Sequence, residues 1–485
     1  MFTNLKPYPE YVDLGIQWLG RLPVSWESSR LRGVSRLLVS NVDKLTHEDE
    51  RPVRLCNYVD VYKNEFITDR PGYMTASASD DEIRRFRVRV DDVAITKDSE
   101  SWTDIGIPAY VAEEADDLVC GYHLGLLRTR KDRLSGTYLF RALQVPAIAT
   151  QFHVAACGVT RYGLSQDDIL SAIVPIPSLS EQAAIVKYLG HANARIDRAI
   201  ATRRKLIALL EEQKQAIINQ AVTRGLDSTV AFKDFGITWL GEVPDHWRVW
   251  PIGRLARVGN GSTPSRTTPE FWQDGSYPWL NSSFANRQEV FESDQFVTTR
   301  ALAECHLPIV PPESVIVAIT GQGKTRGKAA LLKMEATINQ HLAYLTPDPR
   351  RVIGPFLQAV LVAAYPELRR ISDDSGSTKG ALTCQDLKVF RVPVPPLVEQ
   401  ARIVQSIRDE TETAEAAVDR AARQIELLRE FRTRLTADVV TGQLDVREAA
   451  AQLPELDLAD LVSNVGTDEQ DLDAELAENL EEVDA

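Results

Sequence analysis

The chain has 485 residues, of which 44% are hydrophobic and 26% charged, and its formal net charge is −14. Because a single hydrophobic core stops growing near roughly 250–300 residues, this length predicts two or more domains. The sequence contains no long apolar run, no apolar N-terminal signal and no CxxC pair among its five cysteines. We therefore expect a cytoplasmic protein without membrane spans, a disulfide framework or a zinc ribbon.

The acidity of the chain is concentrated at its C-terminus. Residues 446–485 contain thirteen Asp and Glu but one base, Arg447, so residues 1–445 are close to neutral. An acidic segment of this kind is typical of a solvated, disordered chain. We expect an acidic disordered tail over 446–485, and a body in which the local clustering of bases decides what it binds.

Two pairs of segments reveal an internal repeat. DLGIQWLGRLPVSW at 13–26 and DFGITWLGEVPDHW at 234–247 match at eight of fourteen positions, two of them tryptophans, at an offset of 221. VPIPSLSEQAAIV at 174–186 and VPVPPLVEQARIV at 392–404 match at an offset of 218. The chain is therefore a tandem duplication followed by a tail.

Each repeat begins with short runs rich in Val, Ile, Tyr, Trp, Gly and Pro. VRVDDVAITK at 88–97 and VIVAITGQG at 315–323 are typical of strands that lead into loops. We predict mixed α/β domains over 1–177 and 228–395.

A proline-free segment follows each domain, and its apolar residues recur every three or four positions. Ser178 or Ser180 can cap the first of these segments, with Glu181 in its first turn. We predict helices over 178–227 and 396–445, each about 65 Å long. We expect their stripes to bury each other and to hold partner subunits. The residues assigned to this role are Ile185, Leu189, Ile196, Leu210, Ile403, Ile407, Leu428 and Leu435.

The predicted fold is α+β. Two globular mixed α/β domains are separated by a long antiparallel two-helix coiled coil, because two equally long apolar stripes can pair. The tandem duplication gives this arrangement pseudo-two-fold symmetry.

No motif in the sequence has the spacing of a catalytic or cofactor site. GQGKTRGKA at 321–329 resembles a phosphate-binding loop, but five residues separate Gly321 from Gly327, and Ala329 replaces the magnesium-binding hydroxyl. GxSxG, HExxH, GxGxxG and Asn-Pro-Pro-aromatic strings are absent from the sequence, and its histidines are scattered. We therefore predict a binding protein without catalytic residues, a metal or a cofactor of its own.

Three loop-like segments of the second domain combine glycine, hydroxyl groups and bases: GNGSTPSR at 259–266, TGQGKTRGK at 320–328 and SGSTKGAL at 375–382. Glycine allows close approach, hydroxyl and basic groups suit phosphates, and Asn and Gln amides suit base edges. The candidate DNA-binding residues are Ser262, Thr263, Asn281, Gln322, Lys324, Arg326, Lys328, His341, Ser377, Thr378 and Lys379.

The first domain has counterparts of these segments. TKDSESW at 96–102 follows its strand as TGQGKTR follows the other strand, and ACGVTRYGL at 156–164 aligns with SGSTKGALT at an offset of 218. Because the loops differ, we expect the two domains to recognise different targets. The candidate DNA-binding residues are Lys97, Ser99, His123, Thr160, Arg161 and Tyr162.

The repeated tryptophan segments, GSTKGAL, and PIPSLSEQ and PVPPLVEQ before a long helix closely resemble the specificity subunit of type I restriction-modification enzymes, over about residues 8–445. The resemblance implies two target recognition domains, each binding one half of a bipartite, asymmetric double-stranded DNA sequence. It implies helices that dock two methyltransferase subunits, restriction subunits that join this core, and no active site in the chain itself. S-adenosylmethionine, ATP and Mg are then expected in the partner subunits, in a bacterial or archaeal cytoplasm.

One alternative is an orphan or decoy regulator that binds methyltransferase subunits through the helices without reading DNA. The acidic tail favours it, because such a tail could imitate DNA. An independent enzyme would need a catalytic cluster that the sequence lacks, and a purely structural coiled coil would leave both globular domains unexplained.

Overall fold

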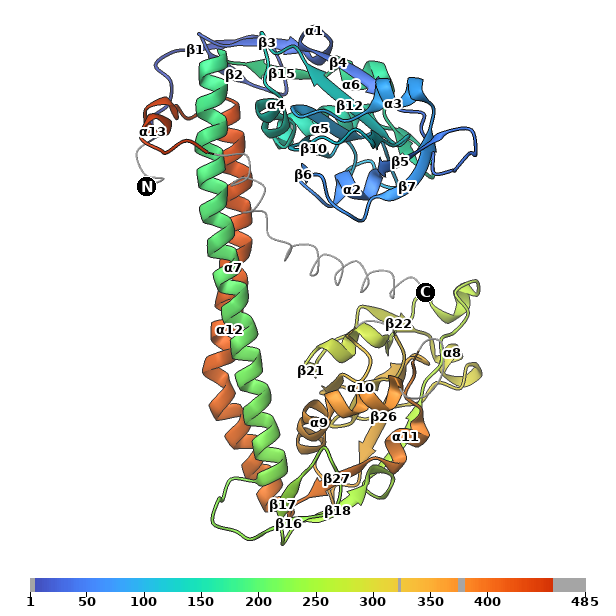
Figure 1. Cartoon of the computed structure of the whole chain (residues 1–485). Helices are drawn as coiled ribbons and strands as arrows, with labels where there is room; N and C mark the ends of the chain where they lie inside the picture. Colours follow the sequence, from blue (N-terminus) through green and yellow to red (C-terminus); the bar gives the residue numbers. More distant parts are fainter. Residues whose placement is uncertain (1–4, 322–323, 374–379, 457–485) are drawn as a thin grey trace. The chain divides into compact units, whose positions relative to one another are not determined.

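The computed structural model shows a mixed α/β protein composed of two compact units (Figure 1). The residues that it describes are 5–321, 324–373 and 380–456. Among them, unit 1 contains the residues up to 203 and those from 423, and unit 2 contains 204–422. Each unit therefore combines one α/β domain with parts of both long helices.

The first domain, in unit 1, is organised around a five-stranded sheet with the order β4-β12-β8-β10-β6. Its strands are β4 (Ser35–Val39), β6 (Phe66–Ile67), β8 (Asp92–Thr96), β10 (Pro108–Val111) and β12 (Leu124–Thr129). Neighbouring strands are antiparallel except β6, which is parallel to β10. Val93 and Ile95 pack with Tyr138 of α4 (Gly136–Leu143), whereas Ala94 belongs to a second cluster, as the two-residue period of a strand requires.

The remaining elements of this domain surround the five-stranded sheet. Two smaller sheets have the orders β11-β5-β7 and β13-β14-β9. These and the other elements are β1 (Tyr11–Asp13), β2 (Arg21–Pro23), β3 (Glu27–Arg30), α1 (Leu31–Val34), β5 (Arg51–Cys56), α2 (Tyr58–Tyr62), β7 (Met74–Ala78), α3 (Asp80–Phe86), β9 (Asp98–Ser99), β11 (Leu118–Cys120), α5 (Pro146–Ala155), β13 (Cys157–Gly158), β14 (Tyr162–Gly163), α6 (Gln166–Ser171) and β15 (Ile173–Ile176).

The second domain, in unit 2, has the corresponding five-stranded sheet in the order β19-β26-β23-β24-β21. Its elements are β16 (Phe232–Asp234), β17 (Glu242–Pro244), β18 (Arg248–Pro251), β19 (Ala256–Asn260), β20 (Tyr277–Leu280), η3 (Ser282–Asn286), β21 (Glu289–Val290), β22 (Gln295–Val297), α8 (Thr299–Glu304), β23 (Val315–Ala318), β24 (Ala329–Leu332), β25 (Thr337–Ile338), β26 (Leu342–Pro347), α9 (Gly354–Ala363), α10 (Tyr365–Asp373), α11 (Cys384–Val389) and β27 (Arg391–Val394). The short 3-10 helices η1 (Ile252–Arg254) and η2 (Pro269–Phe271) complete it.

The two sheets share their strand register as well as their order. Tyr110 of β10 lies opposite Val93 of β8, and Leu331 of β24 lies opposite Val315 of β23. The matching order and register make these positions equivalent in the two units. The duplication predicted from the sequence is therefore present in the fold.

The repeated tryptophan and glutamate residues contact each other within each unit. Trp26 Nε1 donates to Glu181 Oε1 at 3.2 Å in unit 1, and Trp247 Nε1 donates to Glu399 Oε1 at 2.9 Å in unit 2. Both indole rings are buried. These bonds fix the first turn of each long helix against its own domain, which gives the repeated motif a structural role.

The glutamine after each of these glutamates makes a second repeated connection. The backbone N–H of Ser135 donates to Gln182 Oε1 at 2.9 Å, and the backbone N–H of Ile353 donates to Gln400 Oε1 at 3.0 Å. Each glutamine also donates to two backbone carbonyls and has no exposed surface. A buried amide with all these partners holds the start of α4 or α9 beside the start of a long helix.

The long helices are α7 (Leu179–Arg224) and α12 (Leu397–Val440). In unit 1, Arg432 forms an ion pair with Asp197, and Arg203 Nε donates to Gln424 Oε1 at 3.0 Å. From Asp197 to Arg203 the residue number rises along α7, while the number of the α12 residue in contact falls from Arg432 to Gln424. The two helices are therefore antiparallel in unit 1. In unit 2, Lys214 Nζ lies 3.2 Å from Glu415 Oε1.

Each long helix ends before the limit predicted from the sequence. Gly225 and Gly442 follow the two helices closely, and each has a φ of +71°. Glycine adopts this left-handed conformation without a Cβ penalty and so ends a helix efficiently. The shared Leu-Asp pairs at 226–227 and 444–445 therefore lie outside the helices.

The predicted apolar stripe is buried inside the protein, so its assignment to partner binding was wrong for most positions. Leu210 and Leu428 are half-buried, and the other six side chains are between 0% and 7% exposed. The buried six are Ile185, Leu189, Ile196, Ile403, Ile407 and Leu435. Ile185, Leu189 and Leu435 belong to the hydrophobic core of unit 1, and Ile403 and Ile407 belong to that of unit 2. A partner subunit that binds the long helices would therefore contact apolar side chains outside this stripe.

The beginning of the predicted disordered tail is folded. Val446 and Ala450 are buried in the core of unit 1 around α13 (Arg447–Ala451), and Lys187 Nζ lies 2.6 Å from Glu455 Oε1. The sequence failed to predict this because the net charge of the segment concealed its apolar face. The rest of the tail, 457–485, lies outside the described residues. Within the described part of the chain, no helix has the length and apolarity needed to cross a bilayer.

Candidate nucleic-acid interface

In the second domain, the predicted loops converge at the end of β23. The N–H of Leu382 donates to the carbonyl of Ile319 at 2.8 Å, and the N–H of Ser262 donates to the carbonyl of Ile338 at 3.1 Å. These bonds bring the segments 259–266 and 380–382 to the strand end from which 320–328 departs. The sequence indicated only that these loops have a similar composition, whereas the structure shows that they lie close together.

Arg326 connects the loops from within. Its guanidinium donates to the carbonyls of Gly321 (3.2 Å) and Gly380 (2.6 Å) and pairs with Asp373, and only 4% of its side chain is exposed. The prediction that Arg326 contacts DNA was therefore wrong. Its charge is used to hold two loops together.

A hydrogen-bonded chain of four side chains links three loops. Thr263 Oγ1 donates to Gln340 Oε1, and Gln340 Nε2 lies 3.1 Å from His341 Nε2. His341 Nδ1 lies 2.5 Å from Thr320 Oγ1. Gln340 is exposed, whereas the other three side chains are half-buried. These hydrogen bonds thus hold the exposed amide of Gln340 in place.

The other candidates of the second domain have different surroundings. Asn281 is buried, and its Oδ1 accepts from Ser283 N–H at 3.0 Å, so its assignment as a base reader was wrong and it caps η3. Ser262 is half-buried, Lys324 is exposed, and Lys328 is half-buried beside the cavity described below. Four further candidates lie outside the described residues: Gln322, Ser377, Thr378 and Lys379.

In the first domain, the candidates gather around Asp98. Lys97 Nζ and His123 Nδ1 each lie 2.9 Å from Asp98 Oδ2. Burial raises the pKa of Asp98, but its hydrogen bonds to Lys97 and His123 outweigh burial and hold that pKa below its usual range. The sequence analysis did not identify Asp98, because an acid beside a lysine resembles ordinary surface charge.

β9 and β14 bring the remaining candidates of this domain beside that cluster. Tyr162 pairs with Ser99 in an antiparallel register, and the N–H of Leu164 donates to the carbonyl of Lys97 at 2.8 Å. Thr160 and Arg161 are exposed on the turn before β14. Ser99 is 5% exposed and accepts from a neighbouring backbone N–H, so its predicted contact with DNA was wrong.

The two domains hold a histidine in the same way. His123 precedes β12 and is bound by Asp98, two residues after β8; His341 precedes β26 and is bound by Thr320, two residues after β23. The sheet registers make these positions equivalent. The histidine therefore occupies the same position in both sheets, but the residue that binds it is an aspartate in the first domain and a threonine in the second.

Arg266 is a further surface cation that sequence analysis missed. Its guanidinium carbon lies 3.8 Å from the centre of the Trp272 ring, and its Nη2 donates to Gln295 Oε1 at 2.6 Å. Stacking on an indole fixes the plane of the guanidinium while leaving it at the surface. The close spacing of Arg266 and Trp272 in a polar loop was the available signal.

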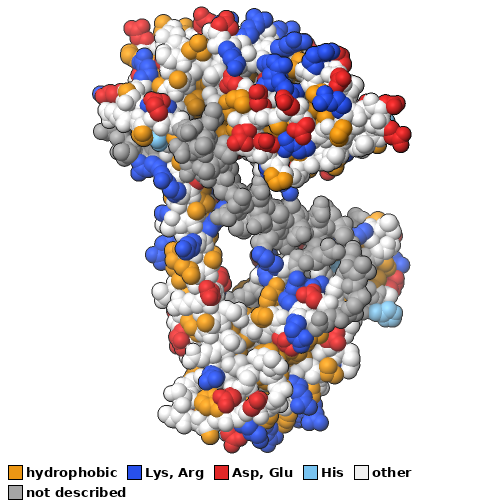
Figure 2. Space-filling model, viewed as in Figure 1, with side chains coloured by type: hydrophobic (Ala, Val, Ile, Leu, Met, Phe, Trp, Pro, Cys, Tyr) orange, Lys and Arg blue, Asp and Glu red, His pale blue; other side chains and the backbone are white. Residues whose placement is uncertain are grey.

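Basic side chains of the first domain are mixed with acids rather than gathered in one patch, as Figure 2 shows for its visible face. Arg128 Nη2 lies 2.7 Å from Asp92 Oδ2, and Arg87 forms an ion pair with Asp116. Each contact pairs one arginine of a basic segment, RRFRVR at 84–89 or RTRKDR at 128–133, with a carboxylate. A DNA phosphate would have to compete with those carboxylates.

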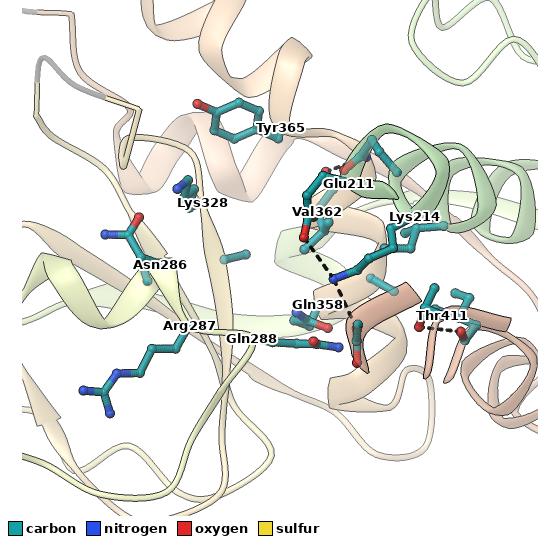
Figure 3. Close-up of a pocket in the computed structure, with 17 residues that line it drawn as sticks. Glu211, Lys214, Asn286, Arg287, Gln288, Lys328, Gln358, Val362, Tyr365 and Thr411 are labelled. Carbon is teal, nitrogen blue, oxygen red and sulfur yellow. Dashed lines mark hydrogen bonds and ion pairs between the residues drawn. The ribbon is translucent and has the colours of Figure 1, made fainter. Parts of the chain in front are cut away.

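A cavity of about 320 Å³ lies in unit 2 between the second domain and the long helices (Figure 3). Gln288, Gln358 and Val362 line its domain side, while Lys214 and Glu415 approach it from α7 and α12. Lys214 is paired with Glu415 and lies 3.7 Å from Glu211. The cavity is therefore lined by amides and an internal ion-pair cluster.

In unit 1, the counterpart of the cavity-lining Gln358 belongs to a cluster of aromatic rings. Phe66, Tyr110 and Phe140 have ring centres 5.7–6.3 Å apart, and they correspond in register to Glu289, Leu331 and Gln358. Arg141, at the position of Ala359, adds a bond from its Nη1 to Glu65 Oε2 at 3.3 Å. Unit 1 therefore has a packed phenylalanine, Phe140, where unit 2 has the cavity-lining Gln358.

The fold and these surfaces define a duplicated α/β protein with paired loop clusters and an antiparallel pair of long helices. Residues 244–416 match the family described as Type I restriction modification DNA specificity domain. The chain is therefore similar to the specificity subunits of type I restriction-modification enzymes, as the sequence predicted.

Two relatives and one solved structure give the extent of this likeness. The MjaX type I restriction enzyme specificity subunit of Methanocaldococcus jannaschii is 22% identical over 80% of this chain and 88% of its own. The EcoR124I/EcoR124II specificity subunit of Escherichia coli is 25% identical over 52% of this chain and 59% of its own. A chain solved in work on complex assembly and conformational transition of the type I R-M system has a TM-score of 0.58. It is 18% identical over 87% of this chain and 99% of its own, and supports the fold.

Proposed function

We propose that this chain is the DNA-binding specificity subunit of a type I restriction-modification complex. Each α/β domain acts as a target recognition domain and binds one half of a bipartite, asymmetric double-stranded DNA sequence. The observation that carries the proposal is the equivalent histidine, bound in each domain from the same strand end but beside different loops. One scaffold with two different surfaces suits two different half-sites.

We further propose that two methyltransferase subunits bind the long helices, and that restriction subunits join the complex they form. Leu209 of α7 is 53% exposed, and its repeat counterpart Leu427 of α12 is 63% exposed. Leu206 and Phe431 are also exposed, at 45% and 39%. Exposed apolar side chains on a helix suit a protein partner. They replace the buried stripe as the candidate contact.

The chain itself is proposed to have no catalytic role. S-adenosylmethionine, Mg and ATP would belong to the methyltransferase and restriction subunits. The chain would then choose where those subunits act, and its own chemistry would be limited to hydrogen bonds and ion pairs with DNA and protein.

The test is to co-express the chain with methyltransferase subunits encoded beside its gene and to sequence the methylated DNA. The proposal predicts one bipartite asymmetric motif, modified on both strands. A regulator that binds methyltransferase subunits without reading DNA would form the complex but yield no motif. Repeating the assay with a chain that ends at residue 456 would show whether the acidic segment 457–485 suppresses DNA binding.

A further inference from the structure

Gln340 is the exposed member of the hydrogen-bonded chain of side chains that links the loops of the second domain. Its amide has two neighbours among the described residues: the hydroxyl of Thr263 at Oε1 and the imidazole of His341 at Nε2. An amide carries two N–H donors and two lone pairs. One N–H and one lone pair are therefore left for a ligand.

The hydrogen bonds of Gln340 fix the position of its amide group. Because Gln340 Nε2 can only donate, His341 Nε2 must accept, so the proton of the neutral imidazole is on Nδ1. That Nδ1–H lies 2.5 Å from Thr320 Oγ1, which can accept it. Thr263 donates to Gln340 Oε1 in this arrangement, and its hydroxyl can also accept from the amide nitrogen. The network thus holds the amide between Thr263 and His341, and either orientation of the amide leaves one donor and one acceptor for a ligand.

We propose that Gln340 reads an adenine in the half-site bound by the second domain, with His341 as its positioning residue. This inference rests on the proposed function. Adenine presents an N6 donor and an N7 acceptor in the major groove, and a glutamine amide is complementary to that pair. Guanine offers two acceptors on that edge, so the fixed amide would discriminate against it.

Other polar side chains near these loops are less suited to this role. Asn281 is buried and caps η3, and Arg326 is buried between two loop carbonyls. Arg266 is exposed, but a guanidinium has donors only and suits guanine or phosphate. Gln340 combines exposure with a fixed pair of one donor and one acceptor.

Under this proposal, the first domain has no glutamine at the position equivalent to Gln340. Tyr122 stands one residue before His123, as Gln340 stands one residue before His341, and the two rings of this first pair lie 3.7 Å apart. A tyrosine cannot offer the paired donor and acceptor of an amide. The adenine preference should therefore be confined to the second half-site.

The experiment selects bound duplexes from a random-sequence DNA library with the chain in complex with its methyltransferase subunits. Gln340→Ala should reduce the preference for adenine at one position of one half-site by about tenfold, within the range for a lost amide–base pair. Gln340→Glu, which presents only acceptors, should shift that position toward cytosine, whose N4 donates. Gln385→Ala, an exposed glutamine of α11, is the matched control and should change no position.

The positioning role of His341 is tested by rescue. His341→Ala should weaken discrimination at the same position as Gln340→Ala, whereas His341→Gln, which can place an acceptor where Nε2 lies, should restore it. His341→Asn is too short to do so. A purely structural histidine would instead give the same loss with all three variants, or altered preferences at many positions.

Each outcome has a defined meaning. If Gln340→Ala and Gln340→Glu leave both half-sites unchanged, the inference is wrong while the proposed function stands. If His341→Ala changes nothing although Gln340→Ala does, the positioning role is wrong. If the unaltered complex binds the library but selects no motif, the proposed function itself fails, and this inference fails with it.

Discussion

The junction between domain and long helices is built differently in the two units. In unit 1, Phe140 packs against Phe66 and Tyr110, whereas its counterpart in unit 2, Gln358, lines an open cavity. Nevertheless, the same hydrogen bonds of a tryptophan, a glutamate and a glutamine hold the first turn of both long helices against the domains. We call each such set of bonds a clamp. The comparison shows that the same hydrogen bonds attach the long helices to both domains, although the side chains that pack beside those bonds differ between the two units.

The largest expected effect comes from removing an aromatic ring in unit 1. Phe140 is 2% exposed and contacts two other rings. Phe140→Ala should lower the free energy of unfolding by about 3–5 kcal/mol, as for other buried phenylalanines. The matched variant Gln358→Ala faces a cavity that already exists, so it should cost less than about 1 kcal/mol. Urea titration of each variant measures the difference. Equal losses would show that the two junctions are energetically alike.

The next effect tests the part of the frame that both units share. Gln182→Ala and Gln400→Ala each leave a buried backbone N–H and two carbonyls without their side-chain partner. Each should destabilise its unit by about 1–3 kcal/mol, the cost of unsatisfied buried polar groups. The two losses, measured by denaturation, should agree within experimental scatter. An effect in one unit alone would contradict an equivalent clamp.

Partner binding should be affected by single changes on the exposed helix faces. Leu209→Glu and Leu427→Glu place a charge where an apolar contact is proposed, and each should weaken methyltransferase binding by about 2 kcal/mol. Each variant should favour a complex with one methyltransferase subunit instead of two, as measured by native mass spectrometry. Leu45→Glu, at an exposed leucine of the first domain, is the control. Unchanged stoichiometry in both helix variants would rule out these surfaces.

The smallest expected effect concerns Asp98, which has no acidic counterpart in unit 2. The folded pKa of Asp98 lies below its usual range, so its stabilising effect is present at neutral pH and is lost as the pH falls through that lowered value. Asp98→Asn should remove this part of the pH dependence, with a change below about 1 kcal/mol. Unfolding measured between neutral and acidic pH tests it. An unchanged pH profile would show that the Lys97 and His123 contacts contribute nothing.

The sequence predicted the features that repeat or have a regular period. Two tryptophan segments at a fixed offset revealed the duplication, and the three-to-four spacing of apolar residues revealed both helices. The same spacing could not identify what covers each apolar side chain. Ile185 and Ile403 face their own domains because the helix starts are clamped there. That contact joins residues far apart in the chain.

The candidate interface was predictable as a set of loops but not as an arrangement of side chains. Composition pointed to 259–266 and 320–328, and both His123 and His341 were among the candidate residues. The bonds from Thr263 and His341 to Gln340 depend on how β23 and β26 align, which no local pattern contains. For the same reason, Arg326 resembled a DNA ligand until its buried partners were known.

The most direct test of two-domain DNA reading is to sequence DNA methylated by the complete complex, with and without a change in one domain. The account predicts a bipartite motif in which Gln340→Glu alters one half-site, while substitution of Arg161 on the exposed turn of the first domain affects only the other half-site. A change in both half-sites from either variant, or methylation without any motif, would contradict it.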